Sequence, residues 1–125
     1  MTIEIPLHWN KTKTKQTSLS MNNYRNWHYQ TSNKIKHDVS NYLLQFEFPK
    51  YDKVHINYTL VFKDKVKRDI MNFVAVVDKF FLDHLVNAGS LVDDNYLYVR
   101  SYTINPVIIG DENKIIIEVI NDSKR

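Results

Sequence analysis

The chain has 125 residues, of which 43% are hydrophobic and 25% charged, and its formal net charge is +3. This length and composition predict one packed domain over residues 1–125 and exclude a second core or a wholly disordered chain. Cysteine is absent, which excludes disulfides and thiolate metal sites. No apolar run approaches the ~20 residues that a membrane span requires, and the first residues lack the apolar segment of a secretory signal. We therefore expect a cytoplasmic protein without a membrane partner.

The first half of the chain predicts a strand, a long loop and a helix. Residues 3–7 alternate between apolar and polar side chains, which predicts a short strand edged by Pro6. Residues 8–30 show no helical period and mix basic, polar and aromatic side chains, so we expect a long loop. Long loops in compact domains are usually functional or disordered, which makes this one a candidate binding loop. Apolar residues at helical spacing then predict a helix from Thr31 or Ser32 to about Phe46.

The second half predicts a strand, a helix and two further strands. Residues 54–62 alternate as a strand does, and residues 72–88 carry apolar side chains on one side of a helix that ends before Gly89. Strands are expected at 96–104 and 114–119, and the turn between them favours a hairpin. The order β-α-β-α-β-β predicts an α+β fold with a mixed sheet and two helices packed on it.

Basic residues gather in three stretches that are candidates for phosphate contacts. They are Lys11, Lys13 and Lys15; Lys34 and Lys36; and the densest run, Lys63, Lys65, Lys67 and Arg68. Solvated loops explain the same clusters, so charge alone does not decide between the two interpretations.

Two acidic sites flank the second predicted helix. Asp69 precedes the helix, and Asp93 and Asp94 follow Gly89. Because the chain must reverse after Gly89, the next strand can bring the two sites together. Carboxylates bind Mg²⁺, and such an ion promotes phosphodiester hydrolysis. The alternative is that Asp69 only caps the helix and that Asp93 and Asp94 only form a turn.

The residues around these acids resemble the RusA family of Holliday junction resolvases. The family pattern is a basic run, Asp-x-Asp-Asn, a helix with Lys and Asp-x-Leu, then Ala-Gly and an Asp-Asp corner. Residues 67–72, 79–89 and 92–95 keep this order, and residues 20–25 are similar to a Ser-Asn-Asn-Arg-Tyr loop of the family. The resemblance extends over nearly the whole chain, and its specific part is 67–95.

This resemblance implies a RusA-like homodimer that binds four-way DNA junctions and nicks opposing strands with Mg²⁺ or Mn²⁺. The setting that it implies is DNA recombination and repair, commonly in phages, with no small-molecule cofactor. It assigns catalytic roles to Asp69, Asp94 and Lys79. The DNA-binding residues that it indicates are Lys63, Lys65, Lys67, Arg68, Asn22, Asn23 and Arg25.

Two departures from the family pattern weaken the metal site. Met71 stands where the family has its second acidic residue, and the spacer to the Asp-Asp corner is longer by about one helical turn. The candidate metal ligands are Asp69, Asp94, Asp93, Asn72 and Asp78. A DNA-binding protein that does not cut, and a protein-interaction module built on the aromatic loop, are therefore alternatives to a metal-dependent endonuclease.

Aromatic and histidine residues outside this pattern each have more than one interpretation. Tyr24, Trp27 and Tyr29 could stack on bases opened at a junction, or they could pack the loop onto the sheet. The histidines at 37, 55 and 84 lack the spacing of metal ligands, so we expect hydrogen-bonded or surface roles.

Overall fold

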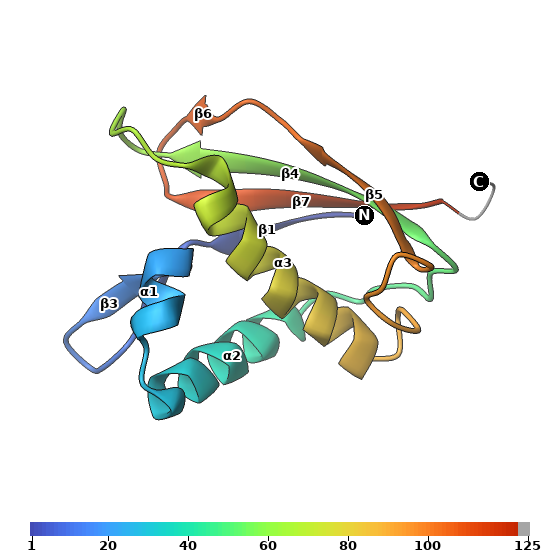
Figure 1. The fold of residues 1–125 in the computed structure, drawn as a ribbon, viewed down its shortest axis with the longest axis horizontal. Helices are drawn as coiled ribbons and strands as arrows, with labels where there is room; N and C mark the ends of the chain where they lie inside the picture. Colours follow the sequence, from blue (N-terminus) through green and yellow to red (C-terminus); the bar gives the residue numbers. More distant parts are fainter. Residues whose placement is uncertain (123–125) are drawn as a thin grey trace.

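The computed structural model describes residues 1–122, which form a mixed α+β fold. The strands are β1 (Thr2–Pro6), β2 (His8–Asn10), β3 (Gln16–Ser18), β4 (Val54–Phe62), β5 (Val99–Ile104), β6 (Ile108–Ile109) and β7 (Lys114–Asn121). The helices are α1 (Met21–Asn26), α2 (Tyr29–Leu43) and α3 (Ile70–Asn87). The long helix α3 crosses in front of the strands, with α1 and α2 beside it (Figure 1).

The main sheet has the order β1-β7-β4-β5, and β6 also pairs with β4. The β1–β7 and β7–β4 pairs are antiparallel, whereas β5 and β6 run parallel to β4. The expected hairpin between the last two long strands is therefore wrong, because β5 and β7 lie on opposite sides of β4. After α3, the chain forms β5 and then β6 along one edge of β4. It then crosses the end of β4 and forms β7 along the other edge. Gly110 lies at this crossing, where a Cβ would stand 2.8 Å from Cγ1 of Val61.

One face of the sheet carries the hydrophobic core. The apolar residues of β4 alternate with partly exposed polar ones, as the sequence predicts, and the apolar side faces the helices. Among the largest fully buried side chains are Tyr58, Ile56, Ile117, Phe81 and Leu85. On the opposite face His55 accepts or donates three hydrogen bonds, to Ser101, Asn57 and Thr103, which is a satisfied polar role.

The stretch expected to be a long loop is in fact folded. It contains the β2–β3 hairpin and the short helix α1, whose N-cap Ser20 accepts a hydrogen bond from the backbone of Asn23. These elements have three to six residues each, which is too short to display a period in the sequence. The helix α2 begins at Tyr29 with His28 as its N-cap, earlier than the predicted Thr31 or Ser32, and ends at Leu43.

The later elements follow the prediction with shifted boundaries. The helix α3 starts two residues earlier than expected, β5 starts three residues later and β7 continues two residues further. A third helix, α1, adds to the two that were predicted. Within residues 1–122, no helix is both long and apolar enough to cross a bilayer.

Candidate functional site

The middle of α3 presents a carboxylate to a cleft between this helix and β5. The cleft is lined by Met71, Val74, Ala75, Asp78, Tyr102 and Ile104. The four residues from α3 follow a three- and four-residue spacing, which places them on one side of the helix. Asp78 is the one carboxylate in an otherwise apolar and aromatic lining. A mostly apolar cleft with a few polar groups is typical of binding and active sites.

Two tyrosine hydroxyls hold Asp78. Tyr58 of β4 donates to Oδ1 of Asp78 at 2.5 Å, and Tyr102 of β5 donates to Oδ2 at 2.8 Å. Burial raises the pKa of Asp78 above its ordinary 3.8, the two hydrogen bonds oppose that rise, and the charge of Asp94 adds to it. Burial, and then the Asp78 carboxylate, raise the pKa of both tyrosines. Both hydroxyls therefore stay protonated at neutral pH and donate to Asp78.

Asp94 lies close enough for its charge to act on Asp78 and Tyr102. It is exposed in the loop that follows α3. The ion pairs among residues 1–122 involve other acids, namely Asp38, Asp64 and Glu4. Two neighbouring carboxylates without a basic partner repel each other, and a bound cation would relieve that repulsion.

Asp69 has a different environment, at the N-terminal end of α3. It is an exposed N-cap residue whose side chain makes no capping hydrogen bond, so the geometry does not support a capping role. It lines a depression formed with Asn22, Lys67, Arg68, Asn72 and Phe73. Asp78 follows nine residues later, about 13 Å along the helix axis and half a turn around it. The charge of Asp94 acts on Asp78, so a pairing of these two acids joins the pairing of Asp69 with Asp94 as a candidate acidic centre.

Asp93 and Asn72, the other candidate ligands, already accept hydrogen bonds. Asp93 accepts a hydrogen bond at Oδ1 from the backbone N–H of Asp94 at 2.8 Å, as in the predicted turn. The Oδ1 atom of Asn72 accepts from the backbone N–H of Asn22 at 3.3 Å. In the described chain, no group of three or more His, Asp or Glu side chains is arranged to hold a metal ion. The candidate centre is therefore the pair of Asp78 and Asp94.

The densest basic run connects β4 with α3. The lysines at 63, 65 and 67 are exposed. Arg68 instead forms an ion pair with Asp64 at 2.9 Å, and its guanidinium lies 4.4 Å from the centroid of the Phe62 ring. The three lysines are thus available to phosphates, whereas Arg68 mainly shapes this loop.

The polar residues of α1 also divide into residues that are exposed and a residue that has a structural role. The Nδ2 atom of Asn23 donates to Oγ of Ser18 at 2.9 Å, so Asn23 ties α1 to β3. Arg25 is exposed in the last turn of α1, and Asn22 is exposed beside the depression that contains Asp69. Asn22 and Arg25 can contact a ligand, while Asn23 has a structural role.

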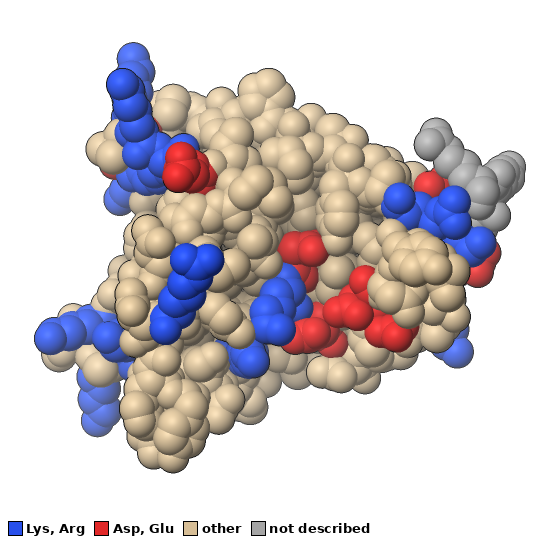
Figure 2. Space-filling model, viewed as in Figure 1, with Lys and Arg blue, Asp and Glu red and all other residues tan. Residues whose placement is uncertain are grey.

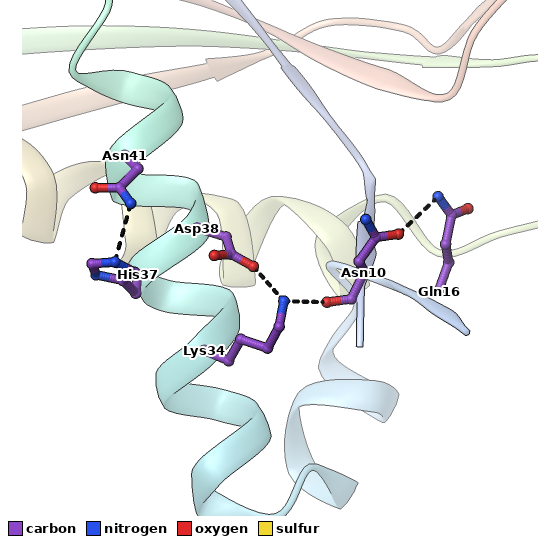
Figure 3. A network of polar contacts seen from close by, with 6 residues as sticks. All are labelled: Asn10, Gln16, Lys34, His37, Asp38 and Asn41. Carbon is purple, nitrogen blue, oxygen red and sulfur yellow. Dashed lines mark hydrogen bonds and ion pairs between the residues drawn. The ribbon is translucent and has the colours of Figure 1, made fainter. Parts of the chain in front are cut away.

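Lys34 belongs to a polar network and is not a free charge. Its Nζ atom donates to Oδ2 of Asp38 at 2.6 Å and to the backbone oxygen of Asn10 at 2.9 Å (Figure 3). Asn10 also accepts from Gln16, so Lys34 connects α2 to the β2–β3 hairpin. This lysine contributes to the fold more than to a basic surface.

The aromatic side chains near α1 pack inward. Tyr24 lies edge-on to Trp27 and to Phe80 of α3, with centroid separations of 5.8 and 6.0 Å. The indole nitrogen of Trp27 donates to Oγ1 of Thr17 at 3.0 Å. These contacts support the packing interpretation for Tyr24 and Trp27, and they leave the proposed protein-interaction loop with little aromatic surface apart from Tyr29, which is 67% exposed.

Charge is unevenly distributed on the face that α3 crosses. Lys and Arg side chains lie on the left half of this face, at its right edge and beside a group of acidic side chains at its centre and lower right (Figure 2). Lys79 follows Asp78 on α3, is exposed and forms no ion pair in the part of the chain that the structure describes. The acidic group and the basic surface therefore adjoin each other.

The two tyrosines were not anticipated as site residues. The alternation of β4 places Tyr58 on the apolar side of the sheet, where a hydroxyl needs a partner. The alternation alone could therefore have predicted that a buried hydrogen-bond acceptor lies near Tyr58. No comparable signal marked Tyr102, because its partner is set by the parallel pairing of β5 with β4.

Comparison of the chain with models of known protein families and with curated proteins finds no match. The RusA-like pattern in residues 67–95 accordingly stays a resemblance. Function is inferred from that pattern together with the residues of the site.

Proposed function

We propose that this protein is a metal-dependent endonuclease that resolves four-way DNA junctions by paired nicks, with a divalent cation held between Asp78 and Asp94. The observation that carries the proposal is the mostly buried Asp78 carboxylate, which two hydroxyls orient and whose pKa the charge of Asp94 helps to raise. Mg²⁺ is typically bound through one or two carboxylates, with water in its other positions, so two acids suffice. When bound, the ion supplies positive charge that stabilises the transition state of phosphodiester hydrolysis.

We take Asp78, among the candidates for this role, as the replacement for the acid that the RusA pattern has at the position of Met71. Met71 lacks the carboxylate that the pattern contains, and the spacer is longer by about one helical turn. Asp78 directly precedes Lys79, so an acid at this position keeps a carboxylate beside the helix lysine despite the longer spacer. In the proposed reaction, Asp78 and Asp94 bind the cation, and the ammonium of Lys79 binds the scissile phosphate.

The remaining features fit a large polyanionic substrate. The exposed lysines at 63, 65 and 67 neutralise phosphates beyond the scissile one. A homodimer presents two centres to the two opposing strands of a junction, which gives paired nicks. A cytoplasmic location would place the protein with its DNA.

The test is cleavage of a synthetic four-way junction with Mg²⁺, with EDTA and a linear duplex of the same sequence as controls. We expect symmetric nicks that require the metal, and we expect their loss in Asp78→Asn and in Asp94→Asn. Circular dichroism checks that both variants are folded. Cleavage at the wild-type rate by both variants would remove the pair from the mechanism.

A DNA-binding protein that does not cut is the second candidate. It is favoured by the absence, within residues 1–122, of any group of three acidic or histidine ligands. Here the junction is bound without Mg²⁺ and is not nicked. Ala75 lines the same cleft three residues before Asp78, so Ala75→Asp adds a carboxylate about 5 Å along the helix axis. Nicking by Ala75→Asp alone would establish this second candidate, and Met71→Asp, seven residues from Asp78, is the matched control.

A further inference from the structure

Three elements of the fold meet at Asp78. The helix α3 supplies the carboxylate, and the parallel neighbours β4 and β5 supply one hydroxyl each. Ile56 is the register partner of Tyr102, and Tyr58 that of Ile104, so both tyrosines project from the same face of the sheet. Their rings are stacked, with centroids 6.1 Å apart and planes at 19°. The two hydroxyls are therefore held together beneath the helix.

The two hydrogen bonds orient the Asp78 carboxylate and leave some of its acceptor positions free. Each oxygen of Asp78 accepts one hydroxyl, which sets the rotation of the carboxyl group about its last bond. A carboxylate has about four acceptor positions in all, so about two stay free for another ligand. Tyr58 is fully buried, while Tyr102 is 43% exposed and lines the cleft. One donor is thus fixed by the core, and the other lies at the entrance of the site.

We infer that Tyr58 and Tyr102 are positioning residues that hold the Asp78 carboxylate in the orientation that binds a divalent cation. This inference rests on the proposed metal site. It assigns the tyrosines no contact with the cation or with DNA; they act through Asp78. Partners that orient a metal ligand commonly change metal affinity or activity by about 10- to 100-fold when they are removed.

The main variant is Tyr102→Phe, which removes one hydroxyl from a partly exposed ring and leaves the core intact. Mn²⁺ binding is measured by isothermal titration calorimetry, and the Mg²⁺ dependence of junction nicking is measured in parallel. We expect the Mn²⁺ dissociation constant and the Mg²⁺ concentration for half-maximal nicking to rise together by about tenfold or more, with little change in the rate at saturating Mg²⁺. Tyr58→Phe should act in the same direction.

Two controls separate orientation of Asp78 from a general effect. Tyr96 is 82% exposed, and Tyr96→Phe removes a hydroxyl from the same part of the chain. In an Asp78→Asn background, Tyr102→Phe should cause no further loss of Mn²⁺ affinity, because the residue through which it acts is gone.

The outcomes distinguish this inference from the proposed function. An unchanged Mn²⁺ dissociation constant in Tyr102→Phe, or an equal weakening by Tyr96→Phe, overturns the inference and leaves the nuclease proposal standing. Mn²⁺ binding that weakens in Tyr102→Phe, in a wild-type protein that does not nick, supports the inference and overturns the nuclease. A wild-type protein that does not bind Mn²⁺ overturns both.

Discussion

Asp69, the N-cap of α3, and Asp78, in the middle of this helix, have very different surroundings. At the N-terminal end, Asp69 is exposed in a polar depression beside Lys67 and Asn72. In the middle of the helix, Asp78 is mostly buried, accepts two tyrosine hydroxyls and lies near Asp94. The first carboxylate is exposed and makes no capping hydrogen bond, whereas two hydrogen bonds hold the second in one orientation.

This difference shows that surroundings decide which carboxylate is suited to bind an ion. A ligand that is already oriented loses little conformational entropy when it binds, and a like charge at close range makes a cation favourable. Lys67, which lines the same depression as Asp69, instead suits that end of α3 to phosphates. Under the proposed function, ion binding is expected at the middle of the helix and binding of the DNA backbone at its beginning.

The largest expected effect tests this assignment directly. Asp78→Asn should reduce Mg²⁺-dependent junction nicking by at least about 100-fold, because it removes a ligand and its charge. Asp69→Asn, the matched variant at the other end of the helix, should reduce the same rate much less. Single-turnover nicking at saturating Mg²⁺ measures both. The reverse order of effects would move the metal centre to Asp69 and refute the comparison.

The long elements of the fold were predictable from the sequence, and the contacts of the site were not. The alternation in residues 54–62 predicted β4 with its correct bounds, and the apolar side of α3 was evident from its spacing. Those periods reflect burial, which is encoded locally. The pairing of β5 with β4, and hence the approach of Tyr102 to Asp78, depends on long-range topology. Asp78 was accordingly one ligand candidate among several.

A smaller effect is expected from the basic run at the start of α3. Replacing both Lys65 and Lys67 by Gln should weaken junction binding and lower the slope of log affinity against log salt by about 1 for each lysine that contacts a phosphate. Filter binding or fluorescence anisotropy across a salt series, in EDTA, measures the slope. Lys34→Gln is the control, because its ammonium is already bound to Asp38 and Asn10. A slope that changes in the control but not in the double variant would contradict the assignment.

The pH dependence of stability should also reflect the burial of Asp78, because burial disfavours the charged form of its carboxyl group. Its pKa is raised mainly by burial, so in EDTA its contribution to the free energy of unfolding is full below about pH 4 and is lost as the pH rises through its shifted pKa. Asp78→Asn retains a hydrogen-bonding side chain without the charge. We expect its Tm to equal or exceed that of the wild type at pH 7, with the difference decreasing towards pH 4. A large destabilisation at pH 7 would indicate that the carboxylate stabilises the fold.

The smallest effect concerns His84, a buried base on the same helix. Its pKa is lowered, whereas that of Asp78 is raised, so its contribution to stability changes with pH in the opposite direction. Burial lowers the pKa of His84 below its ordinary 6.5, and its Nδ1 atom lies 3.3 Å from Oγ of Ser40. Below pH 6.5 the unfolded chain binds a proton that the native protein resists, so the free energy of unfolding decreases as the pH falls towards the lowered pKa.

Thermal melts between pH 7.5 and 5 should therefore show a Tm that falls by a few degrees in the wild type and falls less in His84→Gln. The pKa of His8 is also lowered, by burial and then by Lys63 and Arg68, so His8→Gln is measured beside it. If burial is the property that separates Asp78 from Asp69, it must act on a base of α3 as well as on an acid. A wild-type slope in His84→Gln would show that burial on α3 does not lower the pKa of His84, and burial would then need a direct titration of Asp78 before it could distinguish the two aspartates.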